Sequence, residues 1–165
     1  MFRIVASFVL CCLLSALSFA PGMAAETNPF VGTWTLNVAK SKVDEGRLPQ
    51  SEVRTYSTNL EGALTLIAEG IEADGTPYAY GATGDINGRE YPVVGRDVGA
   101  RILGDAISWR RIDPTTVEMT IKKKGAVLNT TRHSVSEDGK TLTISENGAD
   151  DEGRPIHETR LYDRQ

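Results

Sequence analysis

The residue types that most often carry out chemistry are sparse in this sequence. Its two histidines, His133 and His157, lack the spacing of metal ligands, and we expect both at the protein surface. The cysteines, Cys11 and Cys12, lie inside one apolar run. The sequence contains no Ser-His-Asp arrangement, nucleophile elbow, phosphate-binding loop or paired-carboxylate constellation. It therefore gives no support for an enzyme, a metal centre or a bound cofactor.

A pair of residues near the C-terminus is better suited to binding. Arg160 and Tyr162 are two positions apart, so they share one face of a β-strand. Together they would supply the charge-assisted hydrogen bonds that a buried carboxylate needs. Glu158 shares that face and could instead neutralise Arg160. Arg54 and Tyr56 repeat the same spacing on an earlier strand.

Three further aromatic residues have the spacing of a pocket wall. Tyr78 and Tyr80 share one strand face, and Ile107 and Trp109 share another. These side chains would suit an apolar ligand pocket. Ordinary core packing explains them equally well, because a small barrel can be filled by its own side chains.

The N-terminus has the layout of a secretory signal. Arg3 precedes an apolar run over residues 4–20, and small residues follow it up to Ala24. This run is shorter than the roughly 20 apolar residues needed to cross a membrane. We therefore expect residues 1–24 to form a signal peptide that is cleaved after Ala24, with Ala25 as the alternative. The product would be secreted or periplasmic, with no transmembrane anchor after cleavage.

Within the remaining chain, residues 26–165 have the size of one domain. It contains no cysteine, so disulfides and thiolate chemistry are excluded from it. The full chain has a net charge of −4, and loss of the signal peptide with its single arginine makes it more acidic. Nucleic acid and anionic membrane surfaces are therefore poor partners.

Apolar and polar residues alternate along the whole chain after the signal, between Asp-Gly, Asn-Gly and Lys-Gly turn signals. This pattern predicts an all-β domain of consecutive antiparallel strands. Such a meander avoids two unprotected edges by closing, so we expect a single up-and-down β-barrel. The gap at 39–50 has room for a short helix over 39–45, and the gap at 94–104 is rich in glycine. The predicted strands are 33–38, 51–58, 63–69, 76–83, 88–93, 105–111, 116–122, 127–135, 140–146 and 155–163.

Both ends of the domain resemble known barrel families. The Gly32-x-Trp34 opening resembles that of lipocalins, and with Phe30 it is similar to the Phe-x-Gly-x-Trp opening of fatty-acid-binding proteins. The ending, residues 159–162, resembles the Thr-Arg-x-Tyr ending of the latter family. The whole domain also resembles exported bacterial lipocalin-like proteins of unassigned role. Only residues 39–50 are available where fatty-acid-binding proteins place two helices, so the resemblance implies a lipocalin-like barrel.

The opening motif implies a closed barrel floor. Gly32 would let the chain bend tightly into the floor, and the Trp34 ring would plug it. An arginine on the last strand, Arg160 or Arg164, would stack on the indole.

The resemblance also implies a ligand site inside the barrel, in which arginines and a tyrosine bind the carboxylate of a fatty acid or a similar anion. The two histidines would then lie on the faces opposite these arginines. The residues of this expected site, including the aromatic wall, are Arg132, Arg160, Tyr162, Tyr78, Tyr80 and Trp109.

Two functions follow from these observations. The first is an exported binding protein that carries or sequesters a small hydrophobic or amphipathic ligand. The second is a non-enzymatic interaction or envelope-associated module whose barrel is filled by side chains and whose loops, especially 94–104, contact a partner. A calycin-like enzyme that works by enclosing its substrate is a third reading, with no catalytic residues to support it. A continuous cavity would favour the first function, and a filled lumen the second.

Overall fold

A computed structural model describes residues 28–43, 48–95, 104–149 and 155–165. The predicted signal peptide lies outside these residues, as does most of the 94–104 segment. Each predicted strand is present with small shifts at its ends. The strands are β1 (Gly32–Leu36), β2 (Ser51–Thr58), β3 (Leu64–Ile71), β4 (Pro77–Gly84), β5 (Asn87–Gly95), β6 (Ala106–Asp113), β7 (Thr116–Lys123), β8 (Ala126–Val135), β9 (Thr141–Ala149) and β10 (Pro155–Arg164).

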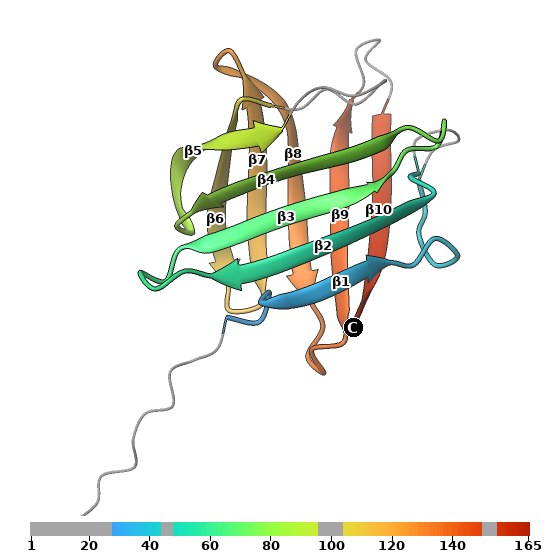
Figure 1. Cartoon of the computed structure of the whole chain (residues 1–165), viewed down its shortest axis with the longest axis horizontal. Coiled ribbons are helices and arrows are strands. Elements are labelled where there is room, and N and C mark those ends of the chain that lie inside the picture. The colour runs from blue at the N-terminus through green and yellow to red at the C-terminus, as the bar shows by residue number, and fades with distance from the viewer. Residues whose placement is uncertain (1–27, 44–47, 96–103, 150–154) are drawn as a thin grey trace, which may run out of the picture.

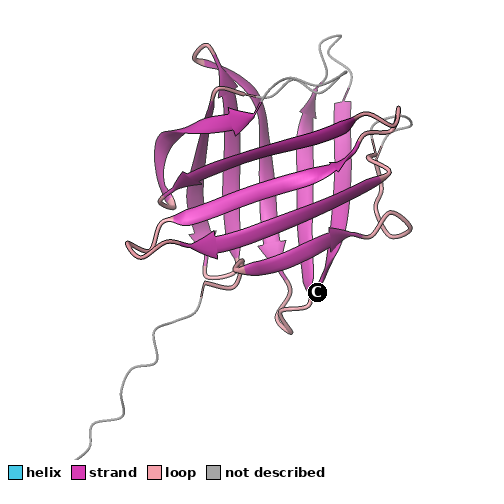
Figure 2. Ribbon diagram, in the orientation of Figure 1, coloured by secondary structure: helices cyan, strands magenta, loops and turns pink. Residues whose placement is uncertain are grey.

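The strands close into one up-and-down barrel, as the alternation pattern predicts. Neighbours in sequence pair antiparallel, and β1 pairs with both β2 and β10. In Figure 1, β1 to β4 run across β6 to β10, and β5 bends from one layer towards the other. Figure 2 draws the described residues as strands and loops, with no helix among them.

Burial alternates along the strands because successive side chains point to opposite faces. On β2, for example, Glu52, Arg54 and Tyr56 are buried while their neighbours are exposed. β3 and β4 follow the same rule. The place of a residue in this alternation therefore shows whether its side chain points into the closed barrel. Its floor and one wall are apolar, whereas β2 and β10 contribute charged residues.

The floor of the barrel is built on Trp34, whose side chain is fully buried. Its Nε1 donates a hydrogen bond of 2.8 Å to the carbonyl of Phe30, which holds the entering chain beneath the ring. The guanidinium of Arg164 lies over the indole, with Cζ 4.1 Å from the ring centroid. A cation at this distance is attracted to the negative face of the ring.

Arg164, rather than Arg160, is therefore the arginine over Trp34. It also donates hydrogen bonds of 2.7 Å to the carbonyls of Pro29 and Val31, which ties the last strand to the chain that enters β1. Gly32 adopts a φ of +139°, and a Cβ at this position would collide with the Arg164 guanidinium. A glycine is required here for both reasons.

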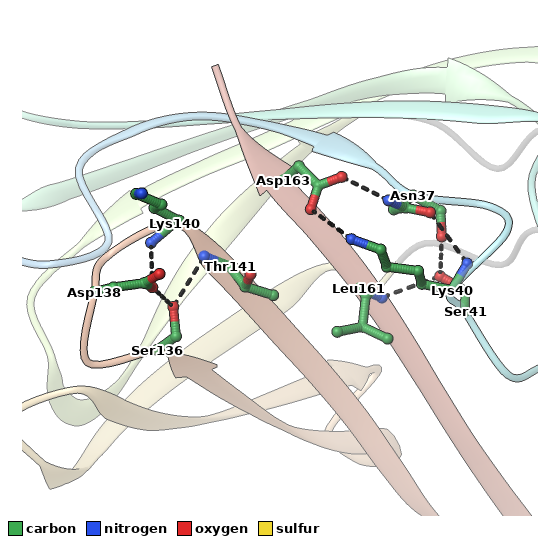
Figure 3. Close-up of polar contacts among 9 residues, drawn as sticks. All are labelled: Asn37, Lys40, Ser41, Ser136, Asp138, Lys140, Thr141, Leu161 and Asp163. Atoms are coloured by element: carbon green, nitrogen blue, oxygen red, sulfur yellow. Dashed lines mark hydrogen bonds and ion pairs between the residues drawn. The ribbon is translucent and has the colours of Figure 1, made fainter.

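The connection after β1 does not contain the predicted helix in its described part. Residues 39–43 form a turn followed by a β-bridge from Lys42 to Thr159. The Ser41 hydroxyl accepts a hydrogen bond from the backbone N–H of Leu161 at 3.0 Å and donates one to the carbonyl of Asn37 at 2.8 Å (Figure 3). These bonds satisfy the backbone through β10, so a helix is not needed for that purpose.

The turn from β8 to β9 is fixed by local side-chain hydrogen bonds. The Asp138 carboxylate accepts hydrogen bonds from the Ser136 hydroxyl at 2.6 Å and from the backbone N–H of Lys140 at 3.0 Å (Figure 3). Gly139 adopts a φ of +69°, a conformation that glycine reaches without strain. The Asp-Gly signal in the sequence therefore marks a tight hairpin.

We expect Trp34→Ala to lower the free energy of unfolding by about 3 to 5 kcal/mol, because it removes a buried aromatic ring from the floor. Denaturant midpoints measure this change. Leu60→Ala is a suitable control because Leu60 is fully exposed in a turn, and it should change stability very little. A nearly neutral Trp34→Ala would contradict the role of this residue as the plug of the floor.

Candidate functional site

The strands on either side of β1 carry the same pattern, Glu-x-Arg-x-Tyr. On each strand the three named residues alternate, so all of them point into the barrel. They are buried except for Arg160, whose side chain is 16% exposed. The residues are Glu52, Arg54 and Tyr56 on β2 and Glu158, Arg160 and Tyr162 on β10. We call this set, together with the side chains that bond to it, the interior polar cluster.

The β2 half of the interior polar cluster reaches across β3 to β4. The Nε of Arg54 forms an ion pair with Glu52, and its Nη2 donates a hydrogen bond of 2.9 Å to the hydroxyl of Tyr80. Tyr78 donates a hydrogen bond of 2.7 Å to the second oxygen of Glu52. Between these strands, Ala68 is in register with both Arg54 and Tyr80. Its small side chain leaves room for the arginine and tyrosine to meet above β3.

The β10 half contains a second ion pair. Arg160 donates a hydrogen bond of 2.8 Å from Nη2 to Glu158, whose carboxylate is buried. Glu158 thus neutralises Arg160, one of the two roles expected from their shared face. Arg54 links the two halves, since its Cζ lies 5.4 Å from the ring centroid of Tyr162.

His133 on β8 completes the interior polar cluster. Its Nδ1 lies 3.3 Å from the hydroxyl of Tyr56, and its Nε2 lies 2.9 Å from the hydroxyl of Thr131. Burial lowers the pKa of His133 well below its usual value, and the positive charges of Arg54 and Arg160 lower it further. The imidazole is therefore neutral at pH 7.

Tyr56 and Tyr162 remain protonated over the physiological range. Burial raises the pKa of Tyr56 to about 12, and burial also raises the pKa of Tyr162. For Arg54, burial acts to lower the pKa, but Glu52 and the surrounding phenols outweigh it and raise the pKa above its ordinary value. The cluster thus holds charged arginines beside phenols that can still donate hydrogen bonds.

Besides Arg54 Nε, which is ion-paired with Glu52, three buried donor atoms of the cluster have no hydrogen-bond partner among the described residues. They are Nη1 of Arg54, Nε of Arg160 and the hydroxyl oxygen of Tyr162. On β6, Nε1 of Trp109 is also buried with no hydrogen-bond partner among the described residues. Leaving such a group unpaired costs about 1 to 3 kcal/mol. A bound molecule with acceptor atoms would remove this cost.

The structure brings together four of the residues predicted from the sequence, namely Arg160, Tyr162, Tyr78 and Tyr80. Trp109 faces the interior from β6, where its ring packs 6.5 Å from that of Tyr91.

Arg132 is not part of this site, and its expected inward orientation is wrong. It is exposed on the outer face of β8, in register with Glu118. The expected surface position of His133 is wrong for the same reason, whereas His157 is exposed as expected. Val135 is buried at the end of β8, and alternation from it places His133 inside and Arg132 outside.

Sequence reasoning missed Glu52 and gave no site role to Arg54 or His133. Two signals could have found them. The shared Glu-x-Arg-x-Tyr pattern marks β2 and β10 as equivalent contributors. Counting back in twos from the apolar Val135 places His133 inside the barrel.

Much of the described interior is filled by its own side chains. Leu66, Ala68, Trp109 and Tyr162 have no exposed surface at all. An apolar hollow lies on the outside of the barrel, a trough of about 490 Å³ over β3, β4 and β5. Its apolar rim includes Ile67 and Val94, which are 48% and 74% exposed.

The described residues contain no group of three or more histidine, cysteine, aspartate or glutamate side chains placed to hold a metal ion. A scan against protein-family models found no matching family, and comparisons with curated proteins and with solved structures found no similar protein. The geometry of the interior polar cluster is therefore the basis on which a function can be inferred.

We expect stability to depend on His133 below neutral pH. Since its pKa is lowered in the folded state, the unfolded chain binds the proton more tightly than the native protein does. The contribution is therefore fully present above the unfolded pKa of about 6.5 and is lost as the pH falls below it, by up to about 1.4 kcal/mol per pH unit.

Urea unfolding between pH 7 and pH 5 measures this dependence. His133→Gln should flatten the slope, because the side chain no longer titrates. The matched control, His157→Gln, changes an exposed histidine and should keep the wild-type slope. Equal slopes in wild type and His133→Gln would show that His133 is not the group responsible.

Proposed function

We propose that this protein is an exported binding protein that carries or sequesters a small amphipathic molecule inside its barrel. The head group of the ligand accepts hydrogen bonds from Arg54, Arg160 and Tyr162. The single observation that carries this proposal is the set of buried donors without partners on these three residues.

The composition of the interior supports this reading. Two ion pairs inside a small barrel stabilise the fold less than apolar side chains of the same volume would. Buried groups with perturbed pKa values gather at functional sites more often than elsewhere. Apolar side chains from the facing strands, including Ile107, Trp109 and Met119, offer a wall for the apolar part of the ligand.

The filled part of the described interior favours, taken alone, the interaction module, so a carrier must open to admit its ligand. Around Tyr162 and Trp109 the interior has no exposed surface, so side chains must shift for a molecule to enter. Arg160 is the most exposed charged member of the interior polar cluster. We infer that it moves first and that the ligand is small.

Export forms part of the same proposal. Within the described residues no helix has the length and apolar character needed to cross a membrane. We expect the mature protein to begin at Ala25 or Glu26, because Gly22 and Ala24 supply the small residues preferred at a cleavage site. N-terminal sequencing of the exported protein measures this, and an intact mass that retains residues 1–24 would contradict it.

Native mass spectrometry of protein purified from its own cells tests the binding function. We expect a small-molecule adduct on the wild-type protein. Tyr162→Phe should lower the ratio of bound to free protein by about 3- to 10-fold, since one hydrogen bond is worth about 0.5 to 1.5 kcal/mol. Tyr91→Phe is the matched control, because the Tyr91 hydroxyl contacts Asp85 and Asn87 at the exposed start of β5.

The outer trough supports a second candidate, an interaction module that uses the face formed by β3, β4 and β5. The small outward residues of β4, Ala79 and Gly81, form its base. Exposed Ile67 and Val94 supply apolar contact area beside them. Wild-type protein that carries no small molecule in the native mass spectra would contradict the carrier function and favour this second candidate.

A further inference from the structure

We propose that the head group bound by the interior polar cluster is an uncharged carbonyl, such as an ester or aldehyde, and not a free carboxylate. This inference rests on the proposed binding function and names the chemical class of its ligand. It follows from the balance of charge in the barrel interior.

Each arginine of the cluster already has an anionic partner on its own strand. Glu52 pairs with Arg54 on β2, and the side chains of both are almost completely buried. Glu158 pairs with Arg160 on β10. The two cations are therefore compensated before any ligand binds.

An incoming carboxylate would add an uncompensated negative charge. It would lie close to Glu52 and Glu158, where neither water nor salt screens the repulsion well. Glu146 adds a further carboxylate, in register with Glu158 and on the same face of β9 as the buried residues Leu142 and Ile144. His133 does not offset this charge, because it is neutral.

A neutral carbonyl suits the donors that remain. The free N–H groups of Arg54 Nη1 and the Tyr162 hydroxyl can both donate to one carbonyl oxygen, which has two lone pairs. These hydrogen bonds retain the strength that a charged donor gives. The ligand brings no charge that must be desolvated, so binding leaves both ion pairs intact.

The position of Arg132 decides whether the barrel interior holds an excess of positive charge. An arginine at that position inside the barrel would leave one uncompensated positive charge, and a carboxylate would then be the matching ligand. The structure places Arg132 on the outer face of β8, opposite Glu118. The excess of positive charge on which a carboxylate site depends is therefore missing from the interior polar cluster.

A pair of matched probes tests the inference. Dissociation constants of decanoic acid and methyl decanoate are measured at pH 7 by tryptophan fluorescence. We expect the wild-type protein to bind the ester at least about tenfold more tightly than the carboxylate, because like charges in close contact repel each other.

A charge-removing variant should weaken the preference for the ester. Glu52→Gln leaves Arg54 uncompensated and should raise the affinity for decanoate relative to that for methyl decanoate by at least about tenfold. Glu69→Gln is the matched control, because Glu69 is exposed on the outer face of β3, and it should keep the wild-type preference. If Glu52→Gln does not fold, Glu158→Gln should weaken the preference for the ester in the same way through Arg160.

The possible outcomes distinguish a failure of the neutral-ligand inference from a failure of the proposed binding function. Wild-type protein that binds the acid as tightly as the ester, or more tightly, overturns the neutral-ligand inference and keeps the binding function. An unchanged preference in folded Glu52→Gln also overturns it. Failure of both probes and absence of a native adduct would overturn the binding function as well.

Discussion

Closure of the barrel at β1 is the constraint on which the other features depend. This five-residue strand pairs with β2 on one side and β10 on the other, so it joins the two ends of the meander. Once the barrel is closed, the alternation of side chains assigns strand residues to the interior or the exterior wherever no register shift interrupts the strand. Trp34 stands at the centre of this junction, in register with Arg54 on β2 and Arg164 on β10.

The same junction positions both the floor and the interior polar cluster. Arg164 covers the Trp34 ring at the floor, where its remaining hydrogen bonds reach backbone carbonyls. Arg54, on the other neighbour of Trp34, turns towards Tyr80 and Tyr162 instead. The two arginines therefore have different roles although they flank one residue. Arg164 is satisfied by the protein alone, whereas Arg54 keeps one nitrogen without a partner.

The strands could be predicted from the sequence because alternation and turn residues act locally. The site could be predicted only in part. A shift of one position exchanges inside and outside, and beside the polar run 129–134 only Val135, at the end of the strand, fixes the choice for Arg132 and His133. Contacts such as Arg54 to Tyr80 join residues 26 positions apart. They depend on the small Ala68 between them, and no local pattern reveals that packing.

Each glutamate lies two residues before its arginine, and this spacing affects how a charged interior can form. Each ion pair lies within a single strand, so it can form before the strands that enclose it have assembled. Closure of the barrel then buries neutral pairs and not isolated charges, which lowers the desolvation cost. The same arrangement fixes what the interior accepts afterwards. A site whose arginines are compensated within each strand has hydrogen-bond donors to offer but no excess of positive charge, and such a site favours a polar, uncharged ligand.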